Sequence, residues 1–286
     1  MYRHLPQVHP HRRWDTKCAT AREQNMHLNL AMHSLELIWM QSGMYELVKK
    51  IMPIWATALF DADHMNPYTC NCMWISHFWD PRTDLNYKGQ KWPTAKTSID
   101  EFWTASKENA TEEQSAVDAI IKSAYNFGLA LHYLGDLTQP MHAGNYVTSA
   151  TNQWHTDFEI LTQEWMNEPD VVAKAYDEIK KRYTDDAFKL DEYITTQSQR
   201  PLQAIVRQAA IDSLPFLPAL ESMQHTIGKN DLKAAKTLLP SILAPAIMNT
   251  AIFMYKWVNN VLSLAFRQQS IAFHVEVGGG CNEART

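Results

Sequence analysis

Two pairs of potential metal ligands constrain the fold of this chain more than any other feature of its sequence. His132 and Asp136 are four residues apart, and so are His155 and Glu159. This spacing places both side chains of a pair on one face of an α-helix. His142 lies between the two pairs. Because zinc binds imidazole nitrogen and carboxylate oxygen at about 2 Å, the stretch predicts helices that carry a multinuclear zinc site.

The composition favours a helical protein with a large core. The chain has 286 residues, 45% of them hydrophobic, which is long enough to bury a substantial core. Only 9 residues are glycine, and alternating β-branched residues are rare. The formal net charge is −5, so the basic excess typical of nucleic-acid-binding proteins is not seen. A nuclease is not excluded on this ground, because metal ions can neutralise phosphate charge locally.

Apolar residues at three- and four-residue spacing predict the first helices, over residues 22–40 and 44–60. Residues 61–93 contain three turn signals of the X-Pro type and indicate a loop. A loop of this length is unusual in a compact domain unless it has a function. We therefore expect residues 61–93 to contribute to the site.

A capping-box pattern predicts where the next long helix begins. The segment from Thr111 to Gln114 has the sequence Thr-Glu-Glu-Gln, in which the first and last side chains can bond each other's backbone amides. The predicted helix runs from there to about Gly135. It would carry His132 and Asp136 at its C-terminal end.

The C-terminal half has further amphipathic segments, at about 170–182, 200–227 and 231–267. The long apolar run from Ser241 to Phe266 is interrupted by proline, asparagine and lysine. We interpret it as a buried core helix and expect no transmembrane segment.

Three further segments carry candidate ligands. Asp63 opens the sequence Asp-His-Met-Asn-Pro, His77 lies in Ser-His-Phe-Trp-Asp-Pro, and Trp14 precedes His27 by 13 residues. Together with the paired ligands, these motifs resemble the bacterial zinc-dependent phospholipase C family, of the type of the clostridial alpha-toxin catalytic domain. The motifs span about residues 14–159, and the remaining helices fit the length of the family.

The resemblance implies an all-α fold, with a single multi-helix domain around a trinuclear zinc site, as in these phospholipases C and in single-strand-specific nucleases. It implies three Zn²⁺ ions as cofactors. The ligands implied for the first ion are Asp63, His77, His132 and Asp136, those for the second are His142, His155 and Glu159, and those for the third are Trp14, His27 and the bridging Asp136. Open coordination positions are typical of catalytic zinc, and clustered ions can hold a phosphodiester and activate water.

The N-terminal segment departs from the family pattern. In the family the tryptophan is the first residue and its free amine binds zinc, whereas thirteen residues precede Trp14 here. An amide nitrogen cannot replace an amine as a donor. We therefore predict that residues 1–13 are a leader or pro-segment, removed after Arg13; the alternative is that the third zinc is weak or absent. The phospholipase domain would then comprise residues 14–267, followed by a flexible tail over 268–286.

The sequence gives conflicting signals about the location of the protein. No signal peptide is visible from Met1, because the first residues are polar and lack an apolar central region. Either this start is not the biological start, or the protein stays inside the cell. The family resemblance favours a secreted or periplasmic location. Four cysteines are too few for a disulfide scaffold, and their pairing stays open.

The resemblance also favours a lipid over a nucleic acid as substrate. The last ligand pair ends in Glu159, where the nuclease pattern would have an aspartate, and the loop around His77 matches the lipid-cleaving family. At the positions that hold choline in the phosphatidylcholine enzymes, this chain has Lys17, His64 and Trp74. Trp74 could offer a cation–π face, whereas Lys17 would repel a quaternary ammonium. The headgroup preference therefore stays open.

We expect a zinc-dependent phospholipase C that hydrolyses the glycerol–phosphate bond of phosphatidylcholine-type phospholipids to diacylglycerol and a phosphorylated headgroup. Asp63 is the candidate catalytic residue, either as a zinc ligand, as the group that orients or deprotonates the attacking water, or as both. One alternative is a single-strand-specific nuclease or nucleotidase on the same three-zinc site. The other is a non-catalytic zinc- or membrane-binding protein. We expect a phospholipid membrane or micelle surface as partner, no nucleic acid, and a monomer.

Overall fold

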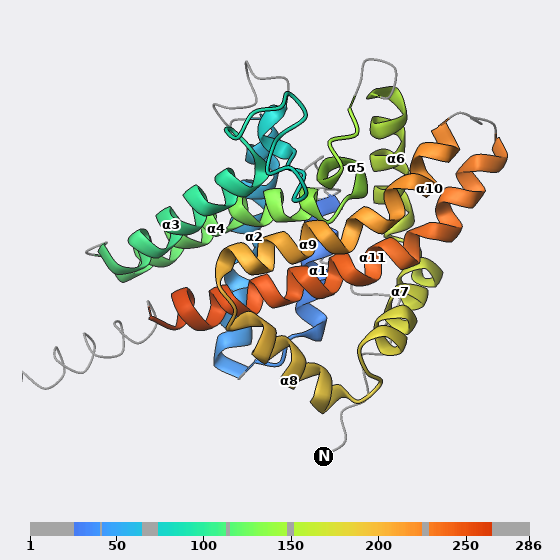
Figure 1. Cartoon of the computed structure of the whole chain (residues 1–286). Helices are drawn as coiled ribbons and strands as arrows, with labels where there is room; N and C mark the ends of the chain where they lie inside the picture. Colours follow the sequence, from blue (N-terminus) through green and yellow to red (C-terminus); the bar gives the residue numbers. More distant parts are fainter. Residues whose placement is uncertain are drawn as a thin grey trace, which may run out of the picture.

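The computed structural model describes residues 26–40, 42–64, 74–112, 115–147, 152–224 and 229–264. Regular structure in these ranges is helical, apart from one isolated bridge between Asp80 and Leu85, so the predicted all-α class is confirmed (Figure 1). The α-helices are α1 (Met26–Leu37), α2 (Ser42–His64), α3 (Ala95–Glu112), α4 (Ala116–Leu137), α5 (Pro140–Ala143), α6 (Asn152–Trp165), α7 (Pro169–Arg182), α8 (Ala187–Ser198), α9 (Leu202–Ser213), α10 (Leu217–Gln224) and α11 (Lys229–Trp257). Two 3₁₀ turns, η1 (Ile75–His77) and η2 (Leu214–Phe216), and a π-helical turn, η3 (Val258–Leu262), complete the set.

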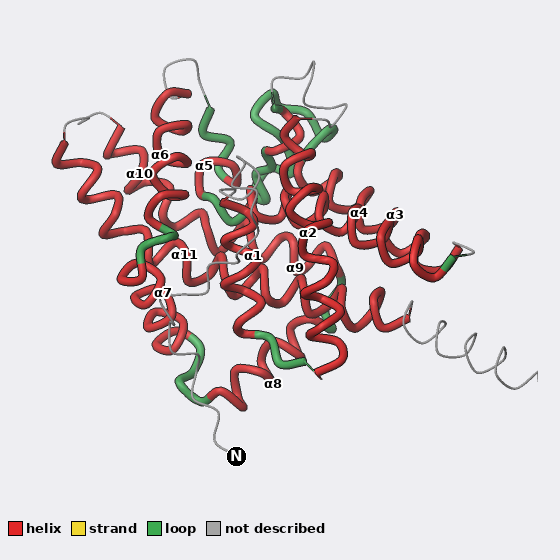
Figure 2. The backbone as a smooth tube through the Cα atoms, turned by 180° about the vertical axis from the view of Figure 1, so that it is seen from behind, coloured by secondary structure: helices red, strands yellow, loops and turns green. Residues whose placement is uncertain are grey.

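Two long helices organise the packing. Helix α4 lies against α2 and α3, and helix α11 packs against α1, α7, α8 and α9. Figure 2 shows the arrangement from behind, with α1 between α11 and α2. The C-terminal halves of α4 and α11 are surrounded by other parts of the protein and are apolar on most of their surface rather than on one stripe.

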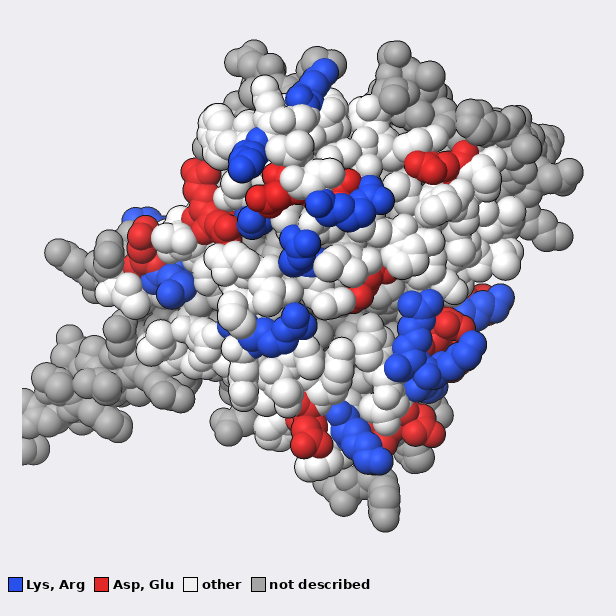
Figure 3. All heavy atoms as spheres, viewed as in Figure 1, with Lys and Arg blue, Asp and Glu red and all other residues white. Residues whose placement is uncertain are grey.

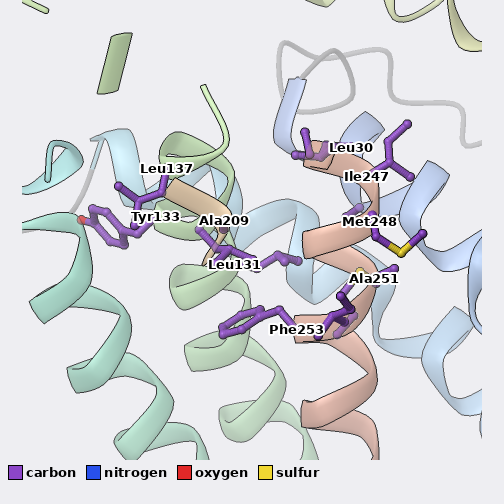
Figure 4. Packing of buried hydrophobic residues seen from close by; sticks show 14 of the residues in the cluster. Leu30, Leu131, Tyr133, Leu137, Ala209, Ile247, Met248, Ala251 and Phe253 are labelled. Carbon is purple, nitrogen blue, oxygen red and sulfur yellow. The ribbon is translucent and has the colours of Figure 1, made fainter. Parts of the chain in front are cut away.

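The core between these helices is closely packed. Figure 4 shows side chains of α1, α4, α9 and α11 in the space between these helices, among them Leu30, Leu131, Ala209 and Phe253. All four are buried. Burial of a large apolar side chain contributes about 1.5–3 kcal/mol. This packing fixes the position of α4, whose C-terminal end carries two of the candidate ligands.

Helix α4 begins later than the capping-box pattern predicts. Thr111 lies in the last turn of α3 and not at the start of the next helix. The N-cap of α4 is Ser115, whose side chain accepts a hydrogen bond from the backbone amide of Asp118. The prediction of a cap at Thr111 is therefore wrong, because Ser115 offers the same chemistry four residues later. The predicted C-terminal end was closer, since α4 ends at Leu137.

Helix α2 corrects the predicted start of the loop over residues 61–93. The helix continues through Pro53, where a kink or restart was predicted, and ends only at His64. Asp63 therefore lies in the last turn of a helix rather than in a loop. The first helix is shorter than predicted at its C-terminal end, which is Leu37 instead of residue 40.

The predicted loop at residues 65–73 lies outside the described residues, and its described part, residues 74–93, is held by side-chain hydrogen bonds. The buried amide of Asn86 accepts hydrogen bonds from the backbone of Lys88 and Gln90 and donates one to the carbonyl of Pro93 at 2.7 Å. The backbone amide of Trp79 donates to the carbonyl of His142 at 3.3 Å. This last bond ties the segment just after η1 to α5, which lies far away in the sequence.

The predicted burial of the long apolar run is confirmed. Residues Ala234–Leu262 are long and apolar enough to cross a membrane, by length and composition alone, and 83% of the most apolar window is buried inside the protein. Helix α11 thus forms part of the core. The expected lack of a transmembrane segment stays a prediction.

Candidate metal centre

The structure brings eight of the nine predicted zinc ligands to one region, where α1, α2, η1, α4, α5 and α6 meet. They are His27, Asp63, His77, His132, Asp136, His142, His155 and Glu159. The ninth, Trp14, lies outside the described residues. The histidines and Asp136 are buried, whereas the side chains of Asp63 and Glu159 are 31% and 36% exposed. These two carboxylates therefore mark the side of the site that is open to solvent.

In the first cluster, Asp63, His77 and His132 form one potential metal-binding group, in which His77 Nδ1 and Asp63 Oδ1 are 3.9 Å apart, and Asp136 lies beside the two histidines. His132 Nε2 lies 3.2 Å from His77 Nδ1 and 3.2 Å from Asp63 Oδ1. Asp136 Oδ2 lies 2.8 Å from His77 Nδ1 and 3.5 Å from His132 Nε2. Bonds of 2.0–2.1 Å to a tetrahedral zinc ion would separate its ligand atoms by about 3.3 Å. The observed distances scatter around this value, so the donor set fits zinc.

The second cluster forms a triangle. Glu159 Oε1 lies 2.9 Å from His142 Nε2 and 3.0 Å from His155 Nε2, and the two nitrogens are 3.0 Å apart. Two imidazole nitrogens and a carboxylate oxygen at this spacing form three corners of a tetrahedron. With three protein ligands, a zinc ion held here would keep a position for water or substrate.

The third group shares residues with the first cluster. His27, on α1, forms a potential metal-binding group with His132 and Asp136. Its Nε2 lies 3.4 Å from Asp136 Oδ1, while the other oxygen of the same carboxylate faces the first cluster. Asp136 can therefore bridge two metal positions, as the family resemblance implies.

Backbone carbonyls orient two of the imidazoles. His132 Nδ1 is 2.9 Å from the carbonyl oxygen of Leu59, and His142 Nδ1 is 2.9 Å from the carbonyl oxygen of His77. A carbonyl only accepts hydrogen bonds, so Nδ1 carries the proton in both rings and Nε2 faces the site. Partners of this kind fix the tautomer and ring direction of metal-binding histidines. Sequence reasoning missed them, since every residue has a carbonyl.

Gly135 and Gln139 also shape the site, and sequence reasoning gave them no role there. A Cβ atom on Gly135 would lie only 2.3 Å from His27 Nδ1, so glycine lets α1 approach α4 closely. Gln139 caps the short helix α5, because its side-chain oxygen accepts hydrogen bonds from the backbone amides of Met141 and His142. A glycine inside a helix next to a ligand was the signal that could have identified Gly135.

The electrostatics couple the imidazoles to the carboxylates. Burial lowers the pKa of His132, but the neighbouring carboxylates outweigh it and raise the pKa to about 9. The same balance, with Asp136 and Glu159 as the acidic neighbours, raises the pKa of His142 to about 9. In His27, burial and the nearby His132 lower the pKa to about 4. Burial raises the pKa of Asp136 and Glu159, but the surrounding imidazoles hold it well below the usual range. Both carboxylates are therefore ionised at neutral pH.

Of the three predicted headgroup residues, the structure describes one side chain. Trp74 is 47% exposed, and its ring centroid lies 5.4 Å from that of His77. It thus stands beside the first cluster and not inside the core. His64 is the last residue of α2, but its side chain lies outside the described set, as does all of Lys17.

Phe78 is a further neighbour of the site that sequence reasoning did not single out. Its ring stacks on that of His142 at 4.4 Å between centroids, with 14° between the planes, and meets His155 edge-on at 5.8 Å. This aromatic contact holds both imidazoles of the second cluster from one side.

Comparisons with known proteins agree with the resemblance read from the motifs. No family model matches the chain. The chain is 27% identical to a phospholipase C of Listeria monocytogenes over 184 residues, which cover 60% of this chain and 62% of the relative. It is 31% identical to a phospholipase C of Bacillus cereus over 157 residues, which cover 51% of this chain and 52% of the relative. The chain thus spans less than two thirds of the length of these curated relatives.

The fold is similar to that of an alpha toxin from Clostridium absonum. The TM-score is 0.61 at 19% identity, and the match covers 84% of this chain and 66% of the toxin. A second alpha-toxin structure, from Clostridium perfringens, matches with a TM-score of 0.53. The predicted resemblance to the bacterial phospholipase C family is therefore confirmed.

Proposed function

We propose that this chain is a zinc-dependent phospholipase C, which hydrolyses the glycerol–phosphate bond of a phospholipid to diacylglycerol and a phosphorylated headgroup. The observation that carries the proposal is the convergence of three donor groups on one partly open site, in a chain similar to proteins named phospholipase C. The groups must lie close together, because metal ions held by them would stabilise the negative charge on several oxygens of the same phosphodiester.

The proposal assigns three Zn²⁺ ions. The first would be held by Asp63, His77, His132 and Asp136, the second by His142, His155 and Glu159, and the third by His27, Asp136 and Trp14. When bound, such ions withdraw charge from phosphoryl oxygens and make a water molecule more acidic. The protein contributes fixed imidazoles, whose direction is set by the carbonyls of Leu59 and His77.

Asp63 is the proposed catalytic residue. Burial raises the pKa of Asp63, but the neighbouring His132 and His77 lower it by more, so the pKa lies below its usual value and the carboxylate is ionised at neutral pH. Its carboxylate is partly exposed, while Oδ1 stays within 3.2 Å of His132 Nε2. One oxygen can thus hold a metal while the carboxylate also orients an attacking water and accepts its proton at the open side.

Headgroup selection is proposed to lie with Trp74, His64 and Lys17. The exposed ring of Trp74 beside His77 supports this role, because an indole face attracts an organic ammonium. On the face shown in Figure 3, acidic and basic residues of the described chain are interspersed and form no continuous basic stripe. This face therefore lacks, in its described part, the basic stripe typical of a nucleic-acid-binding surface.

We also propose that the mature protein is secreted and begins at Trp14, after removal of residues 1–13. N-terminal sequencing of the active protein tests this. Activity with Met1 intact and three zinc ions bound would contradict it.

A substrate panel with zinc counting tests the function. The panel comprises vesicles of phosphatidylcholine, vesicles of phosphatidylethanolamine, and single-stranded DNA. We expect diacylglycerol release from at least one lipid, loss of release after chelation, and recovery with added zinc. His33→Ala is the control substitution and should leave hydrolysis and zinc content unchanged. His33 lies on α1, as His27 does, but packs against Tyr176 away from the clusters. Cleavage of DNA without lipid hydrolysis would favour the nuclease, and full zinc occupancy without any hydrolysis would favour a non-catalytic zinc protein.

A further inference from the structure

A polar cavity lies away from the metal centre. It has a volume of about 270 Å³ and is formed by α8, α9, α11, the residue that follows α7 and the segment between α8 and α9. Its polar lining includes Tyr183, Tyr193, Arg200, Gln208, Asp212 and Asn249. None of the elements that form it supplies a candidate metal ligand. The proposed phospholipase activity therefore leaves this cavity without a role.

Two opposite charges line the cavity, and neither forms an ion pair with another residue that the structure describes. Both carboxylate oxygens of Asp212 accept hydrogen bonds from neutral amides, one from Gln208 Nε2 at 2.7 Å and one from Asn249 Nδ2 at 2.9 Å. The guanidinium of Arg200 donates to Gln197 Oε1 at 3.0 Å. Among the described residues, Asp212 has no cationic side chain and Arg200 no carboxylate within ion-pair distance. The fold thus holds a fixed negative and a fixed positive group in one concavity without joining them.

Two tyrosine rings stand at the same cavity. The centroids of Tyr183 and Tyr193 are 5.2 Å apart, with 49° between the ring planes. Burial and the charge of Asp212 raise the pKa of both hydroxyl groups, while Arg200 acts in the opposite direction on Tyr193. Both phenols therefore stay neutral, and their rings, close to an uncompensated carboxylate, favour an organic ammonium.

We propose that this cavity binds a small zwitterion, with an organic ammonium held by Asp212 and the two tyrosine rings and a carboxylate or phosphate held by Arg200. The ammonium would supply the positive charge that Asp212 lacks, and the guanidinium would bind the anionic group through its fork of N–H donors. The volume lies slightly below the range of about 300–1,000 Å³ typical of sites for drug-sized ligands. It therefore suits a molecule the size of an amino acid or an amino alcohol phosphate.

Calorimetric titration with four probes tests the proposal on the full chain. Glycine betaine and phosphocholine each combine an ammonium with an anionic group, whereas tetramethylammonium and acetate each offer one charge. We expect at least one zwitterion to bind saturably, and each single-charge probe to bind roughly tenfold more weakly or worse. Comparison of betaine with phosphocholine distinguishes a carboxylate ligand from a phosphate ligand.

Substitutions at the cavity locate the binding. Asp212→Asn and Arg200→Gln should each weaken zwitterion binding at least roughly tenfold, and Arg207→Gln, an exposed change on α9 outside the cavity, should leave it unchanged. If Asp212→Asn fails to fold, Arg200→Gln carries the test alone. The proposal is overturned if neither zwitterion binds at millimolar concentration, or if every zwitterion that binds the parent protein binds Arg200→Gln as tightly. Phosphocholine bound only at the metal centre would give this second result.

Discussion

The substitution Gly135→Ala adds one methyl group and is expected to displace the imidazole of His27. Metal binding by the group of His27, His132 and Asp136 should weaken as a result. A Cβ atom at this position would lie 2.3 Å from His27 Nδ1, whereas an ordinary contact begins at 3.4 Å, so the imidazole must retreat by about 1.1 Å. A zinc–nitrogen bond is about 2.0–2.1 Å long, so a shift of this size breaks it. We expect the affinity for one metal ion to fall about 10- to 100-fold.

The effect of Gly135→Ala on the free energy of unfolding should be modest. Replacing glycine by alanine inside a helix stabilises it by about 0.5–1 kcal/mol. Forcing a methyl group into a packed site costs about 1–3 kcal/mol. The two effects partly cancel, which leaves a net loss of roughly 0–2.5 kcal/mol. The variant should therefore fold, and its defect should appear mainly as lost metal.

Gly128→Ala is the matched control, because Gly128 lies on the same helix but contacts α2 and not a ligand. Its added Cβ atom would meet Ala58 Cβ at 2.6 Å and the backbone of Trp55 at 3.2 Å. We expect this control to lose stability with its metal content intact. The assay combines elemental analysis, competition with a chelator, and thermal unfolding. The reasoning is refuted if folded Gly135→Ala binds as many metal ions as the parent protein, with the same affinities.

Three further predictions concern the second cluster, pH and the start of α4. His142→Ala should lower zinc content by one ion and the hydrolysis rate at least about 100-fold, measured by elemental analysis and diacylglycerol release; unchanged kinetics would remove His142 from the site. Because the pKa of His132 and of His142 is raised to about 9, both imidazoles hold protons at pH 7 that zinc must displace, so zinc affinity should rise from pH 7 to 9. Titration calorimetry in buffers of different ionisation enthalpy should show this proton release, and heats independent of the buffer would contradict it. Ser115→Ala should lower the free energy of unfolding by about 0.5–2 kcal/mol in urea denaturation while zinc content stays constant; a loss of zinc would show that the cap also supports the site.

The sequence predicted what local spacing determines. Four-residue spacing predicted that each ligand pair lies on a helix. The structure confirms this, since His132 and Asp136 lie on α4, and His155 and Glu159 lie on α6. The approach of His27 depends on how α1 packs against α4, which no local pattern contains. Only the family resemblance suggested that approach in advance.

The parts that sequence reasoning missed have physical causes. Helices α3 and α8 carry many polar residues, so their apolar pattern is weak, and neither was predicted. The predicted cap at Thr111 failed because capping chemistry recurs at Ser115, and local sequence does not show which residue the neighbouring helix selects. The predicted start of the loop was too early, because α2 continues to His64. Packing of α2 against α4 stabilises the helix, and this tertiary contact is not visible in the local sequence.

The carbonyls of Leu59 and His77, which orient His132 and His142, give the site an unusual tolerance to mutation. No point substitution can delete a main-chain carbonyl, so the side chain of Leu59 could vary during evolution without removing the acceptor. An insertion or deletion in α2 is a different matter, because it would rotate that carbonyl away from His132. Related chains should therefore keep the spacing between Leu59 and Asp63 more strictly than the residue type at position 59.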